Sequence, residues 1–109
     1  MNYNILATRR FEKEIKRLSK RYSSVKEEYA QLIIALQNNP QSGTPIGSNC
    51  YKIRLAISSK GKGKSGGARV ITYLYLDAET IYLLTVYDKS EIASIKSDEL
   101  KKIIKGLEL

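Results

Sequence analysis

The chain has 109 residues, of which 42% are hydrophobic, a formal net charge of +8 and no histidine. This length allows a single core, so we expect residues 1–109 to form one domain, and the composition is that of a globular chain. Without histidine there is no Ser-His-Asp triad, no histidine-based zinc site and no ribonuclease chemistry run by a histidine pair. The one cysteine, Cys50, excludes an internal disulfide. We interpret Cys50 as a small strand residue rather than as a nucleophile, because it has no histidine base.

The N-terminal residues show no signal-peptide pattern, and no apolar run approaches the length of a membrane span. We therefore expect a cytoplasmic protein without membrane contact. Residues 3–7 predict a short first strand, and Thr8 can cap the helix that follows. The apolar stripe of this helix has helical spacing and consists of Phe11, Ile15, Leu18 and Tyr22.

The opposite face of this helix is strongly basic. We favour a solvated surface as its explanation, and additional phosphate contact is the functional alternative. The basic residues are Arg9, Arg10, Lys13, Lys16, Arg17 and Lys20.

A second helix is predicted to begin at a capping box at residues 24–27. It is predicted to end at Asn38, because Pro40 cannot continue a helix. Its inward positions are Val25, Tyr29, Leu32, Ile33 and Leu36. Two short helices joined by a tight turn predict an antiparallel helical hairpin that packs on a sheet.

The remaining chain reads as a loop at residues 41–49, three strands (residues 50–57, 68–76 and 80–87) and a last helix capped by Ser97-Asp98. The inward residues of that helix are Leu100, Ile103, Ile104 and Leu107. The order β-α-α-β-β-β-α predicts an α+β fold with a mainly antiparallel, curved sheet.

Positive charge is concentrated in the middle of the chain. No acidic residue lies between Glu28 and Asp77, whereas six basic residues do. Such clustering favours a nucleic acid as the partner over an anionic membrane, and over the alternative that the charge serves solubility alone. The six are Lys52, Arg54, Lys60, Lys62, Lys64 and Arg69.

Strict alternation along the three strands places an aliphatic set beneath the helices. The other face then gathers Lys52, Arg54, Arg69, Tyr73, Thr85 and Tyr87. A β-bulge would reverse part of this assignment, because one extra residue exchanges the two faces.

The glycine-lysine stretch at residues 60–67 has two interpretations: a flexible hairpin loop, or a mobile phosphate clamp in which Lys60, Lys62 and Lys64 bind RNA. It is not a nucleotide-binding P-loop, because Ser58 stands where the motif needs glycine and a strand follows instead of a helix. For Arg69, a bidentate hydrogen-bonded contact with a phosphate is a better explanation than an edge arginine whose side chain extends to solvent. The strand tyrosines, each ordinary alone, could together form a base-stacking platform.

These segments resemble the RelE/ParE superfamily of toxins. Residues 50–55 (CYKIRL) resemble the second-strand motif of RelE toxins, and residues 60–73 and 82–91 resemble its HigB-like branch. With the order of elements, the resemblance covers nearly the whole chain. It implies a type II toxin that cuts mRNA in the ribosomal A site by attack of the 2′-hydroxyl on the adjacent phosphate. It also implies a cognate antitoxin, the ribosome and mRNA as partners, and no metal or small-molecule cofactor.

Site residues follow from the same resemblance. Lys52 matches a lysine with base or phosphate duty, and Arg54 replaces a second lysine, which favours charge stabilisation there. Arg69 matches the arginine that holds the scissile phosphate. Lys89 lies near a later basic residue that acts as leaving-group acid, and Tyr87 supplies stacking in place of a RelE tyrosine that is absent near Ala93.

Two alternatives stay open at this stage. A ParE-like inhibitor of DNA gyrase without nuclease activity would share this fold, and so would a non-catalytic RNA-binding module. Codon preference, antitoxin identity and oligomeric state leave no signal in the sequence.

Overall fold

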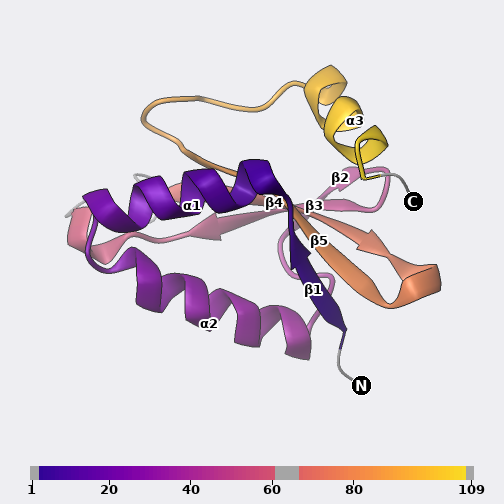
Figure 1. The fold of residues 1–109 in the computed structure, drawn as a ribbon, viewed down its shortest axis with the longest axis horizontal. Helices are drawn as coiled ribbons and strands as arrows, with labels where there is room; N and C mark the ends of the chain where they lie inside the picture. Colours follow the sequence, from indigo (N-terminus) through magenta and orange to yellow (C-terminus); the bar gives the residue numbers. More distant parts are fainter. Residues whose placement is uncertain (1–2, 61–66, 108–109) are drawn as a thin grey trace.

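The computed structural model describes residues 3–60 and 67–107, which form a five-stranded sheet and three α-helices (Figure 1). The sheet order is β1-β5-β4-β3-β2; β1 is parallel to β5 and every other pair is antiparallel. The predicted α+β class and helical hairpin are therefore confirmed. The elements are β1 (Asn4–Ala7), α1 (Arg9–Arg21), α2 (Val25–Asn38), β2 (Thr44–Gly47), β3 (Cys50–Leu55), η1 (Ser58–Lys60), β4 (Ala68–Tyr75), η3 (Leu76–Ala78), β5 (Thr80–Asp88) and α3 (Ser97–Lys105).

Strand β2 is the element that sequence reasoning missed, since residues 41–49 read as a loop. It is a short edge strand whose residues are all exposed, so it has no alternating pattern. Gly43, with φ of +98°, leads into it, and a Cβ there would lie 2.5 Å from the carbonyl oxygen of Lys52. Glycine at this point lets the edge strand approach β3 closely.

Thr8 fixes the start of α1 as predicted: its Oγ accepts a hydrogen bond from the backbone N–H of Phe11 at 3.0 Å. The predicted capping box of α2 is wrong. Ser24 has helical backbone angles and makes no capping bond. Its Oγ instead bonds the Glu28 carboxylate at 2.9 Å and lies 2.8 Å from the Ser59 Oγ, which ties the helical turn to η1.

Helices α1 and α2 cover one face of the sheet, and α3 packs on the other (Figure 1). The main core lies beneath α1 and α2, with the predicted stripe residues Phe11, Ile15 and Leu18 buried in it. Helix α3 begins at Ser97, but Lys96 is its N-cap and makes no side-chain bond, so the predicted serine cap is wrong. None of its residues is fully buried, so α3 is the most weakly anchored of the helices.

A β-bulge in β5 changes the predicted faces. Ile71 pairs with Thr85, but the next residue, Thr72, pairs with Leu83, which leaves Leu84 as the extra residue. Strict alternation placed Leu84 under the helices, whereas it packs on the α3 face and Ile81 and Leu83 lie in the main core. The Thr8 hydroxyl donates to the free carbonyl of Leu84 at 2.8 Å. One residue thus caps α1 and holds the bulge.

Among the described residues, no helix combines the length and apolar character needed to cross a membrane.

Candidate nucleic-acid interface

A row of side chains crosses the three central strands on the face that also carries α3. Arg54 on β3 pairs with Arg69 on β4, which pairs with Tyr87 on β5. Residues paired across neighbouring strands share a face, so these three side chains are neighbours. Lys52 lies two residues along β3 on the same face. The sequence prediction that these four residues come together is confirmed by the strand register.

Two arginines directly opposite each other repel and destabilise a sheet. In the described part of the chain, no carboxylate forms an ion pair with Lys52, Arg54, Arg69 or Lys89. Among the residues that the structure describes, the only hydrogen-bond acceptor of the Arg69 side chain is the carbonyl of Ala68, 3.1 Å from Nη1. The row is therefore a site of uncompensated positive charge, which is suited to an anion.

The row is only partly open to solvent. Arg54 is exposed and Lys52 half-buried, whereas Arg69 and Tyr87 are 4% and 3% exposed. The Tyr87 hydroxyl is buried and has no hydrogen-bond partner among the described residues. Burial raises the pKa of Tyr87, and the positive charge of Arg69 and a weak contact with the Ser94 side chain partly oppose this. In this conformation Arg69 and Tyr87 therefore present little surface to a ligand.

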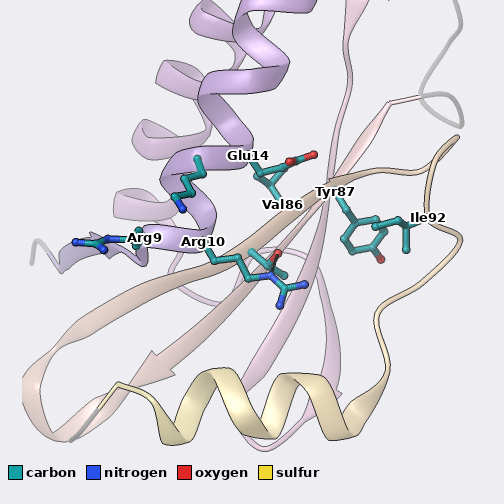
Figure 2. A pocket seen from close by; sticks show the side chains of 8 residues that line it. Arg9, Arg10, Glu14, Val86, Tyr87 and Ile92 are labelled. Carbon is teal, nitrogen blue, oxygen red and sulfur yellow. Dashed lines mark hydrogen bonds between the residues drawn. The ribbon is translucent and has the colours of Figure 1, made fainter.

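The connection between β5 and α3 lies over Tyr87. Ile92 of this connection and Tyr87 line one side of a cleft of about 540 Å³, and residues of α1 line the other (Figure 2). Figure 2 shows Arg10 extending from α1 and Tyr87 lying beside Ile92. Arg10 donates from Nε to the Thr85 Oγ at 3.2 Å, so α1 is joined to the strand that carries Tyr87.

Lys60 does not belong to this surface. Its Nζ lies 2.6 Å from the Asp88 Oδ1 and 5.4 Å from the centre of the Tyr22 ring, and the lysine and aspartate side chains are 7% and 1% exposed. The prediction that Lys60 belongs to a mobile phosphate clamp therefore conflicts with the structure. Lys62 and Lys64 lie outside the described residues.

Burial works to raise the pKa of Asp88, but hydrogen bonds from Lys60 and Ser90 outweigh it and hold that pKa below its usual value. Asp88 directly follows Tyr87, so by alternation its side chain lies on the opposite face of the sheet, which α1 and α2 cover. The Lys60–Asp88 pair therefore fixes the end of β5 beside the candidate site.

Tyr73 and Lys89 stand apart from the row. Tyr73 pairs with Cys50 and Tyr82 and packs in the cluster under α3, roughly 13 Å along the strand from Arg69 at 3.3 Å per residue. It therefore does not share a stacking platform with Arg69. Lys89 is exposed just beyond the end of β5, and its backbone N–H donates to Gly67 at 3.2 Å.

Cys50 behaves as the small strand residue that the sequence predicted. It is 3% exposed, and burial raises the pKa of its thiol to about 11. The described residues also contain no group of three or more acidic or cysteine side chains placed to hold a metal ion.

Sequence reasoning missed Arg10 and Asp88 as residues that position the site. The signal for Arg10 was present in the basic face of its helix, but the partners Thr85 and Glu99 lie far along the chain. The signal for Asp88 was its place next to Tyr87, although nothing local links it to Lys60.

Solved structures with a similar fold include those of E. coli toxin RelE. A mutant of E. coli toxin RelE in the free state has 19% identity and a TM-score of 0.65, with 96% of this chain and 97% of that chain covered. The toxin of the intact E. coli RelBE toxin–antitoxin complex has 20% identity and a TM-score of 0.61, over 79% and 95% of the two chains. A RelE mutant in complex with an antitoxin RelBc peptide has 22% identity and a TM-score of 0.62, over 89% and 98%. At these identities the likeness establishes the fold.

The family is established by a second comparison. The family model described as the RelE toxin of the RelE / RelB toxin-antitoxin system matches residues 4–106. The chain therefore belongs to the RelE toxin family, and its class is that of type II toxin–antitoxin toxins.

Proposed function

We propose that this toxin is a ribosome-dependent endoribonuclease that cleaves mRNA in the A site. The observation that carries the proposal is the row Arg54–Arg69–Tyr87 with Lys52 beside it, positively charged and without ion-pair partners in the described part of the chain. Membership of the RelE family supports the same function. Cationic groups on a rigid sheet can orient a phosphodiester and stabilise the charge that develops during its cleavage.

In the proposed reaction the 2′-oxygen of the nucleotide attacks the adjacent phosphorus, and the bond from phosphorus to the 5′-oxygen breaks. Lys52 takes the 2′-hydroxyl proton or binds a phosphate oxygen, and Arg54 and Arg69 stabilise the negative phosphorane. Lys89 protonates the departing 5′-oxygen. Tyr87 stacks on a base after the connection above it has moved.

The proposed partners are the ribosome with its mRNA and a cognate antitoxin, and the proposed compartment is the cytoplasm. The solved RelBE complex supports an antitoxin partner for this chain. A toxin with net charge +8 suits an acidic, amphipathic antitoxin.

The decisive experiment maps transcript ends by primer extension in a translating extract that contains the purified toxin. We expect codon-phased cuts that need ribosomes, and we expect Arg69→Ala to abolish them while circular dichroism shows an unchanged fold. The matched control is Lys26→Ala, which removes an exposed cation at the start of α2 on the other face of the sheet.

Each alternative has its own result in this experiment. Gyrase-dependent DNA breaks without cuts in mRNA would establish a ParE-like poison. Binding of RNA without any cut by the unsubstituted chain would establish a non-catalytic module. Either result refutes the proposed function.

A further inference from the structure

The connection that covers Tyr87, here called the cover segment (residues 91–96), is weakly anchored to the sheet. Five of its six side chains are exposed, and Ile92, which lies against Tyr87, is 48% exposed. Within the described residues, no backbone hydrogen bond joins residues 93–96 to the sheet. A segment with so few buried contacts opens at low cost.

Ion pairs with α1 hold the cover segment and the start of α3 instead. Glu91 pairs with Arg17 at 2.5 Å and with Arg21 at 3.4 Å, and Glu99 pairs with Arg10 at 2.8 Å. All these side chains are 39–56% exposed, so each pair is weak and open to competition. Arg10 and Arg17 belong to the basic face of α1, and Arg21 is the last residue of that helix. Arg10 also lines the cleft, together with Lys13 and Tyr87.

Two observations make this cleft a candidate site for an anion. Its α1 side carries three positive side chains and one carboxylate, Glu14, which pairs with Arg17. Of the three cations, Arg9 and Lys13 have no ion-pair partner among the described residues. Its other side contains Tyr87, which is almost fully buried; in the described part of the chain its hydroxyl makes no hydrogen bond of good geometry and has only a weak contact with Ser94 of the cover segment. A buried hydroxyl held only by such a contact can be better satisfied by a ligand or by another conformation.

We propose that phosphates of a single-stranded RNA bind along α1 at this cleft, displace Glu91 and Glu99 from their arginines, and so release the cover segment from Tyr87. The inference rests on the proposed function, because it names how the same RNA reaches its site. Phosphate is the competitor expected for an arginine held by a carboxylate, because both anions accept the same forked hydrogen bonds. Substrate binding is then itself the event that exposes the row.

Hydrogen exchange measured by mass spectrometry tests this proposal. The probe is a short oligoribonucleotide with 2′-O-methyl groups, which cannot be cleaved because its nucleophile is blocked. We expect exchange to fall in residues 9–17 when the probe binds. We expect it to rise in residues 91–96 through the amides of Glu91 and Ile92, which both donate to the Asp88 carbonyl at 3.0 Å in the closed arrangement. A ligand that simply docks on the cover segment would slow exchange in both regions.

Substitutions in the absence of RNA supply the second arm. Glu91→Gln and Glu99→Gln should each increase exchange of the cover segment by about two- to fivefold, the factor expected for a surface ion pair. The matched control is Glu27→Gln, which makes the same change of charge on α2, where Glu27 accepts a hydrogen bond from Gln31 at 3.1 Å. Glu27→Gln should leave residues 91–96 unchanged.

Three results would overturn the proposal: no binding of the probe, binding with residues 91–96 unchanged or protected, or equal effects of Glu91→Gln and Glu27→Gln. The readout is separate from the proposed function because it uses exchange and not cleavage. If the toxin cuts no mRNA but the probe still opens the cover segment, the nuclease proposal fails and this inference stands.

Discussion

Replacing Lys60 with methionine removes one partner of the buried Lys60–Asp88 pair while keeping a side chain of similar length. The lysine and aspartate side chains are 7% and 1% exposed, so solvent screens the pair little. Loss of one partner from a buried pair costs about 3–5 kcal/mol, because the other charge stays buried without compensation. We expect a loss of about 3 kcal/mol at pH 7, since Ser90 still donates to Asp88 from its backbone N–H and its hydroxyl at 2.9 and 2.7 Å.

The pH dependence gives this prediction a sign. In the parent chain the folded pKa of Asp88 lies below its unfolded value, so its contribution is present above about pH 4 and is lost as the pH falls through the folded pKa. In Lys60→Met the lysine contact is lost while burial and the two Ser90 bonds remain, so the folded pKa of Asp88 rises relative to the parent chain. Asp88 is then protonated at a higher pH than in the parent, which relieves the buried charge, so the penalty of the variant should shrink as the pH falls from 7 through that folded pKa.

Urea unfolding followed by far-ultraviolet circular dichroism measures the effect. With an m-value of about 1–2 kcal/mol per molar, a 3 kcal/mol loss lowers the midpoint by roughly 1.5–3 M. The double variant Lys60→Met/Asp88→Asn should recover much of the loss, and Glu99→Gln in an exposed pair should cost less than about 1 kcal/mol. A loss below about 1 kcal/mol for Lys60→Met, or a penalty independent of pH, would refute the reasoning.

Three further outcomes are expected. Native Cys50 should resist alkylation at pH 8, because its thiol is 3% exposed and has a pKa of about 11, and rapid labelling by iodoacetamide would contradict that burial. Thr72→Val should raise the free energy of unfolding in urea by about 0.5–2 kcal/mol, because the Thr72 hydroxyl is buried without a hydrogen-bond partner among the described residues. A lower free energy of unfolding would show that this hydroxyl makes a hydrogen bond. Tyr87→Phe should retain more cleavage activity than Tyr87→Ala if stacking dominates, and equal losses in the primer-extension assay would point to the hydroxyl instead.

Local chemistry explains the parts of the fold that were predictable from sequence. The Thr8 cap and the apolar stripe of α1 depend on residues within a few turns of one another. Alternation along β3 and β4 likewise placed Lys52, Arg54 and Arg69 on one face, as the register confirms.

The features that sequence reasoning missed depend on contacts between distant segments or on register. The bulge at Leu84 left no mark in the strand pattern, because Leu84 and Leu83 before it are both leucines and either could face the core. Lys60 was read as part of the glycine loop because its partner Asp88 lies 28 residues away. The burial of Tyr87 comes from a connection whose own sequence is mostly exposed and has no regular period.

The pairing of charges separates the structural cations of this fold from those of the candidate site. Lys60, Arg17 and Arg10 each have a carboxylate within 2.8 Å, and each joins two distant elements. Arg54 and Arg69 face each other across two strands, and no ion pair offsets their repulsion in the described part of the chain. Such a repulsive pair lowers stability, and burial of Arg69 at 4% exposure increases that cost. A bound phosphate removes both penalties at once, so phosphate should raise the free energy of unfolding of the parent chain. Arg69→Met should have a higher free energy of unfolding in urea than the parent chain. That value should not change when phosphate is added.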